Sequence, residues 1–290
     1  MNRQVSISIL LIAIASLTVG CIRETSSGDQ TKSEKLTLTG SSTLAPLVSE
    51  IAGKFEKENS GVRVEVQTGG SSRGIRDVGA GTADIGMASR ALKSGESKGM
   101  VTSTIAWDGV AFVVHAQNPV KSLTKDQLTG IYNGSIKNWR VVGGKDAPII
   151  VSNRAEGRSE LDLVADYFQM KTTEFEADVV DGETQQSIKT VANNENAIVY
   201  TSIGAARISI AEGIPLKLLP LDGVAATAAN VQAGLYPLAR PLILICPEAG
   251  DSVSKSLTEK FIEFSLSSEQ DDVTTGLGYV PPARDSQAGE

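Results

Sequence analysis

The most regular hydrophobic pattern of the chain covers residues 36–55. Leu36 and Leu38 alternate with polar residues, which predicts a β-strand, and Gly40 interrupts the alternation. Two hydroxyl residues, Ser42 and Thr43, then precede apolar residues at the three- and four-residue spacing of one helix face. These apolar residues are Leu44, Leu47, Val48, Ile51 and Phe55. The stretch therefore predicts a strand, a glycine turn and a helix that packs on a sheet.

The same strand, turn and helix pattern occurs twice more. An alternating strand at 62–67 leads through Gly-Gly-Ser-Ser-Arg-Gly at 69–74 into a helix, and a strand at 149–151 leads through 153–159 into another. The start of a helix carries unpaired backbone N–H groups and the positive end of the helix dipole, so it favours an anion. One such turn is typical of any capped surface helix. Three of them predict that a small anion is held by several helix N-termini.

Strands and helices alternate along the rest of the chain, which predicts an α/β fold with largely parallel sheets. Two extended, proline-containing stretches, 115–120 and 236–241, enclose a middle block of ordinary domain size. This arrangement is expected if the chain crosses to a second lobe and returns. We therefore predict one lobe from 36–114 plus 242–284, a second lobe from 115–241, and a tail at 285–290.

The first 20 residues have the pattern of an export signal, with a basic start and an apolar run at 7–19. The run ends at Cys21 after a small residue, which resembles a lipoprotein signal and predicts a lipid on Cys21. Thr18 stands where leucine is usual, so processing without lipidation and an uncleaved anchor are alternatives. The polar segment 21–35 is interpreted as a flexible tether. We expect the protein on the extracytoplasmic face of the cell membrane.

Composition limits the classes of function that the protein can have. The net charge of −7 and the aromatic content of 4% argue against a nucleic-acid-binding protein, so an anion site must depend on local arrangement. The single histidine, His115, ends an apolar strand, and no cluster of residues has metal-ligand spacing. The serine pairs therefore have no second histidine as a base. We expect neither an enzyme nor a bound metal or cofactor.

Several phrases resemble one family, the phosphate-binding proteins of ABC importers. The matching phrases lie at 39–47, 69–75, 83–90, 107–111, 123–139, 197–200, 236–241 and 278–281. The resemblance covers about 36–284. It implies a two-lobed, type II periplasmic-binding (Venus-flytrap) fold that binds phosphate between its lobes and delivers it to a permease with its ATPase. It also implies a monomer.

The resemblance implies a set of binding residues. Hydroxyl and backbone groups of the first two loops would contact phosphate, together with a forked arginine and the helix start that follows it. These residues are Ser42 and Thr43, Ser71 and Ser72, and then Arg154, Arg158 and Ser159. Leu44 would support the first loop, and Glu156 takes the place of an acid that pairs with and orients the arginine.

Two positions depart from the family pattern. Glu160 stands where many relatives have threonine, and its carboxylate would repel phosphate unless it were protonated, turned aside or able to accept the phosphate proton. Arg90 stands where some relatives place the aspartate that accepts that proton. Two alternatives therefore stay open: a binding protein for another oxyanion (sulfate, molybdate or tungstate), and a phosphate sensor or surface protein that keeps the fold.

Overall fold

The computed structural model describes residues 34–248 and 253–283. The predicted signal, the lipidation site Cys21, nearly all of the tether and the tail at 285–290 lie outside the described residues. None of the helices in the described ranges has the length and apolar character needed to span a membrane.

Strands and helices alternate along the chain, and the three predicted strand, turn and helix units are β1 with α1, β2 with α2 and β5 with α4. The strands are β1 (Glu34–Gly40), β2 (Val62–Thr68), β3 (Ile85–Ala88), β4 (Met100–His115), β5 (Ile150–Arg154), β6 (Val179–Asp181), β7 (Ala197–Ser202), β8 (Leu216–Leu218) and β9 (Ala239–Pro247). The α-helices are α1 (Ala45–Glu58), α2 (Ser71–Gly79), α3 (Lys125–Tyr132), α4 (Ser159–Phe168), α5 (Thr184–Ala192), α6 (Ile203–Ala211), α7 (Ala228–Gln232), α8 (Val253–Leu266) and α9 (Asp271–Gly276). The 3₁₀ helices are η1 (Trp139–Val142), η2 (Thr172–Glu174) and η3 (Ser268–Gln270).

The strands pair in the order β2-β1-β3-β9-β4-β7-β5-β6, with β8 beside β4. β1 pairs in parallel with β2 and β3, and β5 pairs in parallel with β6 and β7. Every other ladder is antiparallel and contains β4 or β9. The prediction of largely parallel sheets was therefore wrong. The two long strands that link the halves run in opposite directions, so each contributes antiparallel pairs to the sheet it joins.

Two main hydrophobic cores lie at the two ends of this strand path. One core contains buried residues from Val110 to Leu238, together with Val280. The other contains residues from Leu36 to Ala106 and from Leu242 to Tyr279, and a small third cluster lies under α2. We call 110–238 the middle block, and 34–109 with 239–283 the outer block. The structure places 110–114 in the core of the middle block, whereas the boundaries predicted from the sequence assign these residues to the first lobe.

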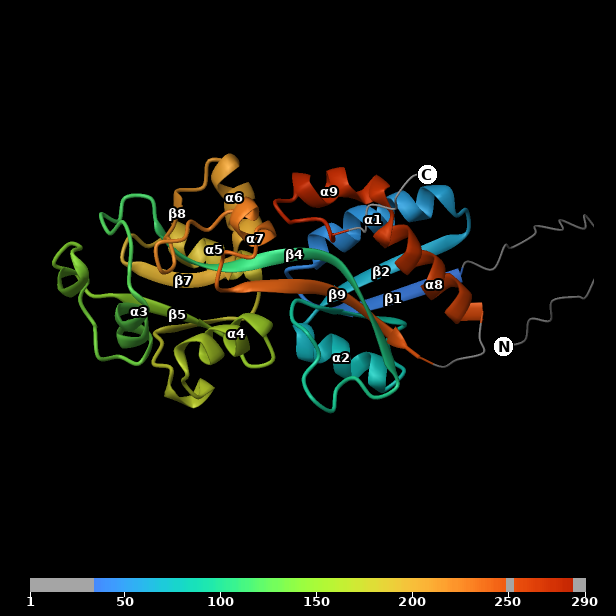
Figure 1. The fold of residues 1–290 in the computed structure, drawn as a ribbon, viewed down its shortest axis with the longest axis horizontal. Helices are drawn as coiled ribbons and strands as arrows, with labels where there is room; N and C mark the ends of the chain where they lie inside the picture. Colours follow the sequence, from blue (N-terminus) through green and yellow to red (C-terminus); the bar gives the residue numbers. More distant parts are fainter. Residues whose placement is uncertain (1–33, 249–252, 284–290) are drawn as a thin grey trace, which may run out of the picture. The chain divides into compact units, whose positions relative to one another are not determined.

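The helix faces predicted from periodicity are confirmed where they can be compared. Leu47, Val48, Ile51 and Phe55 of α1 are buried, and Thr124 caps α3 through a reciprocal pair of hydrogen bonds with Gln127. In the outer block, α1 and α8 cover one face of the sheet and α2 covers the other (Figure 1).

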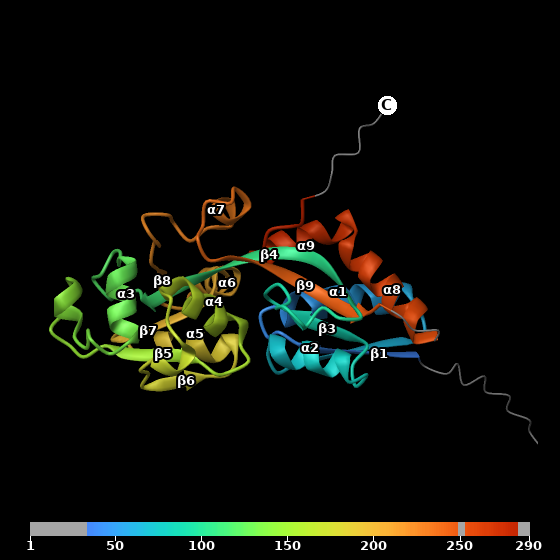
Figure 2. The same cartoon turned by 60° about the horizontal axis from the view of Figure 1, so that its bottom comes forward.

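The strands β4 and β9 run side by side between the two blocks (Figures 1 and 2). Their antiparallel ladder extends from Met100 opposite Pro247 to Gly109 opposite Ala239. Asp108 lies opposite Arg240 near the end of this ladder. The crossing strands therefore place a carboxylate and a guanidinium group where the two blocks meet.

Candidate functional site

Helices α1, α2 and α4 begin at the three glycine- and serine-rich turns, and none of the three has a side-chain cap. Their N-cap residues are Leu44, Gly70 and Arg158, whose own side chains make no capping hydrogen bond, although Ser41 Oγ accepts from Thr43 N and Leu44 N before α1. By contrast, serine or threonine side chains cap α3, α6 and α7. The first turns of the three uncapped helices therefore keep backbone N–H groups that an anion could accept from.

Two glycines allow the turns to approach other backbone segments closely. Gly40 has a φ of +134°, and a Cβ atom there would lie 2.2 Å from the carbonyl oxygen of Met87. Gly70 has a φ of +93°, and its Cβ atom would lie 2.8 Å from the carbonyl oxygen of Gly157 in the middle block. These glycines bring the first turn against β3 and the second turn against the third.

The hydroxyl groups of the turns meet around Ser89, which follows β3. Ser89 Oγ lies 3.0 Å from Ser41 Oγ, 3.4 Å from Ser71 Oγ and 2.6 Å from Ser159 Oγ. All four serines are buried. One residue from each of the three turns thus contributes to a single polar cluster, as the sequence pattern predicts.

Arg154 ends β5 and is almost fully buried, with 2% of its side chain exposed. Its Nη1 atom donates to the carbonyl oxygen of Glu183 at 2.8 Å and to Ser187 Oγ at 2.5 Å. Its Nε and Nη2 atoms are buried and have no hydrogen-bond partner in the part of the chain that the structure describes. A guanidinium group held by one nitrogen and with its other two nitrogens free is suited to bidentate contact with an oxyanion.

A second buried arginine, Arg240 of β9, reaches the same cluster from the crossing strands. Its Nη2 atom donates to Asp108 Oδ2 at 3.0 Å, to Glu160 Oε1 at 3.2 Å and to Thr43 Oγ1 at 3.2 Å. Its Nη1 atom donates to Ser159 Oγ at 3.0 Å. Arg240 therefore contacts residues of both blocks from the strands that connect them.

Glu160, near the start of α4, lies between the two arginines. Its Oε1 atom also accepts a hydrogen bond from Thr43 Oγ1 at 2.9 Å, and its Oε2 atom lies 3.9 Å from Arg154 Nε. Burial raises the pKa of the Glu160 carboxyl, but Arg240 and Arg154 outweigh this effect and hold the pKa well below its usual range. Glu160 is therefore ionised at neutral pH.

Asp108 differs from Glu160 in its electrostatic environment. Burial raises the pKa of the Asp108 carboxyl, and Arg240 only partly opposes the shift. The centre of the cluster thus contains two guanidinium groups and two carboxyl groups, and each arginine faces at least one acid. Groups of three or more histidine, cysteine, aspartate or glutamate side chains that could hold a metal ion do not occur in the described ranges.

Three predicted site residues lie beside this cluster, and two of them pair with other side chains. Arg158 pairs with Glu183 at 3.1 Å, and Arg90 pairs with Glu96 at 2.6 Å. Glu156 is exposed and forms no ion pair with Arg154 in the described part of the chain. The prediction that Glu156 orients Arg154 is not supported by this geometry, because the carbonyl oxygen of Glu183 and Ser187 Oγ hold Arg154 instead. That Arg158 contacts the ligand stays a prediction, since its Nη1 atom is buried without a hydrogen-bond partner among the described residues.

The remaining predicted residues lie at the edge of the cluster. Leu44 is fully buried in the core of the outer block, where it supports the first turn. Ser42 Oγ lies 3.2 Å from Thr184 Oγ1, and Ser72 N donates to the carbonyl oxygen of Gly157 at 3.3 Å. Both contacts join the outer block to the middle block. A cavity of about 250 Å³ opens here, lined by Ser42, Thr43 and Thr184 among others.

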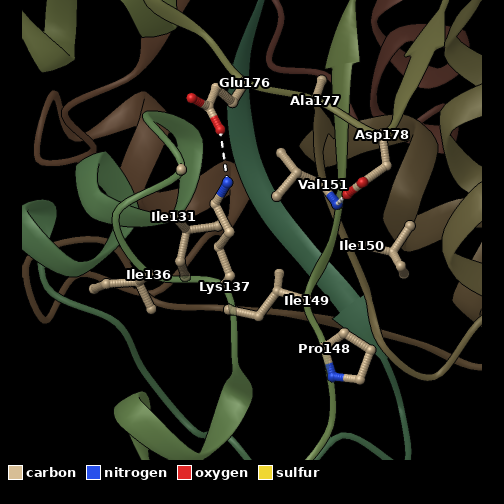
Figure 3. Close-up of a pocket in the computed structure, with 11 residues that line it drawn as sticks. Ile131, Ile136, Lys137, Pro148, Ile149, Ile150, Val151, Glu176, Ala177 and Asp178 are labelled. Carbon is tan, nitrogen blue, oxygen red and sulfur yellow. Dashed lines mark hydrogen bonds and ion pairs between the residues drawn. The ribbon is translucent and has the colours of Figure 1, made fainter.

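Another cavity, of about 270 Å³, lies wholly within the middle block and has a different character (Figure 3). Its wall combines apolar side chains, among them Ile131, Ile136 and Ile149, with charged ones, and its Lys137 pairs with Glu176 at 3.0 Å. The ammonium group is thus already neutralised by a neighbouring carboxylate. This cavity lacks the hydroxyl groups and free guanidinium nitrogens that mark the Ser89 cluster.

The sequence interpretation missed Arg240, Asp108, Ser89 and Ser41 as site residues. Arg240 and Asp108 lie in phrases that carry the family resemblance, but each falls in a strand without a helix start. Ser89 directly precedes Arg90, and the sequence analysis considered only Arg90 at this place, as a departure from the family pattern. Only the pairing of β4 with β9 and of β1 with β3 brings these residues to the three turns.

The chain is similar to several known proteins. Residues 25–269 match the family model described as a PBP superfamily domain. The phosphate-binding protein PstS of Bacillus subtilis is 30% identical over 281 residues, which cover 94% of this chain and 90% of that protein. The PstS of Borreliella burgdorferi is 26% identical over 260 residues, which cover 87% of this chain and 91% of that protein.

A solved structure is similar over most of the fold. It is the crystal structure of a candidate phosphate ABC transporter substrate-binding protein from Clostridium perfringens with bound phosphate. It superimposes with a TM-score of 0.79 at 32% identity, and the match covers 86% of this chain and 100% of that one. The predicted α/β, two-lobed type II fold is thereby confirmed. The chain belongs to the periplasmic-binding-protein superfamily and, within it, to the PstS-like substrate-binding proteins.

Proposed function

We propose that this protein binds inorganic phosphate in the Ser89 cluster and delivers it to an ABC importer. Its relatives are named as phosphate-binding proteins, and one related structure contains phosphate. The protein acts as a binding component and not as an enzyme, and a monomer is sufficient for this role. Its partners are the permease subunits and their ATPase.

The observation that carries this proposal is the state of Arg154. A buried guanidinium group with two unpartnered nitrogens is costly, because each missing hydrogen bond leaves a desolvated donor. An oxyanion in the cluster would accept from these nitrogens, from the hydroxyl groups of Thr43, Ser71 and Ser159, and from the uncapped helix starts. Phosphate, with four oxygens and at least one negative charge, matches such a set of donors.

Titration of the purified domain, residues 34–290, with phosphate, sulfate, molybdate and tungstate by isothermal calorimetry tests the function. We expect saturable one-to-one binding of phosphate and much weaker binding of the other three anions. Tight binding of sulfate or molybdate with no binding of phosphate would instead identify a transporter component for that oxyanion. Deletion of a neighbouring permease gene separates transport from sensing, since only transport would lose phosphate uptake.

We further propose that Cys21 carries a lipid that anchors the domain to the extracytoplasmic membrane face. The support is the sequence pattern before Cys21 and the polar segment after it. Cys21→Ser should release the protein into the soluble extracytoplasmic fraction, and metabolic labelling with a fatty acid should be lost. Cys246→Ser, which changes the only other cysteine, is the control. A variant that stays membrane-bound with its leader intact would indicate an uncleaved anchor.

The middle and outer blocks are proposed as the two lobes, with the crossings at β4 and β9. The separate cores support this division. Lys93 Nζ lies 2.9 Å from Asp162 Oδ2, and Arg90 Nε lies 3.6 Å from the same oxygen. These pairs and the Ser42–Thr184 contact join the two blocks.

A further inference from the structure

The carboxylate of Glu160 makes contacts that a bound oxyanion would be expected to make. It accepts hydrogen bonds from Thr43 Oγ1 and Arg240 Nη2, and it lies within reach of Ser159 Oγ at 3.4 Å. Its second oxygen is the nearest acid to Arg154 Nε, at 3.9 Å. These partners come from the first turn, the third turn, β5 and β9. A side chain of the middle block thereby binds donors of the outer block and of the crossing strands.

The position of Glu160 at the start of α4 also resembles that of an oxyanion bound at a helix N-terminus. Glu160 is the second residue of an uncapped helix, so its carboxylate lies at the positive end of the helix dipole. The backbone N–H group of Glu160, together with Arg240 and Arg154, stabilises the ionised form. The side chain is 4% exposed, so water does not supply these interactions. The helix start that could bind an anion therefore already faces a negative charge from its own chain.

A ligand and the Glu160 carboxylate would compete for the same space. An oxygen that accepts from Arg154 Nε would lie roughly 2.9 Å from that nitrogen. Glu160 Oε2 approaches the same nitrogen to 3.9 Å, and Glu160 Oε1 already accepts from Thr43 and Arg240. Two anions packed this closely in a buried site repel each other strongly. Displacement of the carboxylate removes the repulsion and returns all of these donors to the ligand.

We propose that Glu160 is a tethered competitor of the oxyanion ligand: its carboxylate holds the ligand's donors when no ligand is bound, and it must leave before phosphate can bind. The inference rests on the proposed function, because it concerns the same site. It assigns Glu160 the role of lowering affinity while it keeps the two buried arginines neutralised. The apparent affinity for phosphate is then reduced by the fraction of molecules in which the carboxylate has left.

The test is calorimetric titration with inorganic phosphate of the wild-type domain and of two variants, Glu160→Gln and Glu160→Thr. Glutamine removes the negative charge and keeps nearly the same size. Threonine removes the charge and is also too short to make the hydrogen bonds of the Glu160 carboxylate. We expect both variants to bind phosphate at least about tenfold more tightly than the wild type. We also expect their melting temperatures to fall without phosphate, because two buried arginines lose an acid partner, and to rise further than the wild type's when phosphate is added.

The matched control is Glu156→Gln. It makes the same change of charge four positions earlier in the chain, at an exposed residue outside the cluster. We expect this variant to bind phosphate as the wild type does. A gain in affinity equal to that of Glu160→Gln would mean that only the net charge matters, and it would overturn the proposal.

Binding kinetics give a second readout that does not depend on the stability of the variants. If the carboxylate must leave first, the observed binding rate of the wild type should level off as the phosphate concentration rises, whereas the rate of Glu160→Thr should keep rising.

Weaker phosphate binding by both variants, with a loss of discrimination against sulfate, would overturn the proposal and make Glu160 the acceptor of the phosphate proton. An unchanged dissociation constant would also overturn it. Failure of the folded wild type and every variant to bind phosphate would overturn the proposed function itself.

Discussion

Arg154→Ala should weaken phosphate binding by two or more orders of magnitude. The guanidinium group is buried, and among the described residues its Nε and Nη2 atoms have no hydrogen-bond partner, so an oxyanion would gain charge-assisted hydrogen bonds from both. One such bond contributes about 1.5–3 kcal/mol, and removal of one partner of a buried charge pair costs about 3–5 kcal/mol. A hundredfold loss requires only about 2.7 kcal/mol. Isothermal calorimetry with phosphate measures the change.

The control for this variant is Arg140→Ala, an arginine of η1 whose side chain is 73% exposed and pairs with Asp146. We expect it to leave the phosphate dissociation constant unchanged. Ser71→Ala should cost less than Arg154→Ala, about 1 kcal/mol, because backbone donors of the same turn remain. An Arg154→Ala protein that is folded by circular dichroism and binds phosphate normally would show that the binding site lies elsewhere.

Arg240→Met should lower the free energy of unfolding by about 3–5 kcal/mol, because it leaves two buried acids, Asp108 and Glu160, without their shared partner. Methionine keeps much of the length of the arginine side chain, so the loss of stability measures mainly the effect of removing the positive charge. Unfolding in urea, followed by circular dichroism, measures the difference from the wild type. Arg140→Met serves as the control for the substitution at an exposed ion pair.

The loss in Arg240→Met should depend on pH. In the wild type, the lowered pKa of Glu160 contributes stability that is present above the unfolded-state pKa and is lost as the pH falls. Without Arg240, that contribution shrinks, and the pKa of Asp108, already raised by burial, should rise further. Protonation at low pH then removes the unpaired charges. We therefore expect the difference in stability to decrease as the pH falls from 7 to below about 4, the unfolded-state pKa of a carboxyl group.

A double-mutant cycle tests whether Asp108 and Arg240 act as a pair. Asp108→Asn in the Arg240→Met background should recover part of the lost stability, because it removes one of the buried charges. Additive effects of the two substitutions would contradict a direct interaction between the two side chains across the ladder of β4 and β9.

Much of the local structure could be predicted from the sequence. The apolar spacing at Leu47, Val48, Ile51 and Phe55 fixes which side of α1 is buried, because residues three and four apart share one helix face. The same reasoning holds for α4, whose Leu161, Val164 and Phe168 are buried. The three turns rich in glycine and serine also predicted that their hydroxyl groups would meet, since each follows a strand and begins a helix.

The sequence by itself therefore determined several of the helices and strands, and the three turns that bring serine hydroxyl groups toward an anion site. Only the tertiary structure decided which charges enter that site. Arg240 and Asp108 reach it because β9 pairs with β4, although the two residues are far apart in the chain. Glu160, and not Glu156, lies between the arginines because the start of α4 turns its side chain inward while Glu156 stays exposed. Periodicity is a local property, whereas long-range strand pairing and the burial of charge depend on the whole fold.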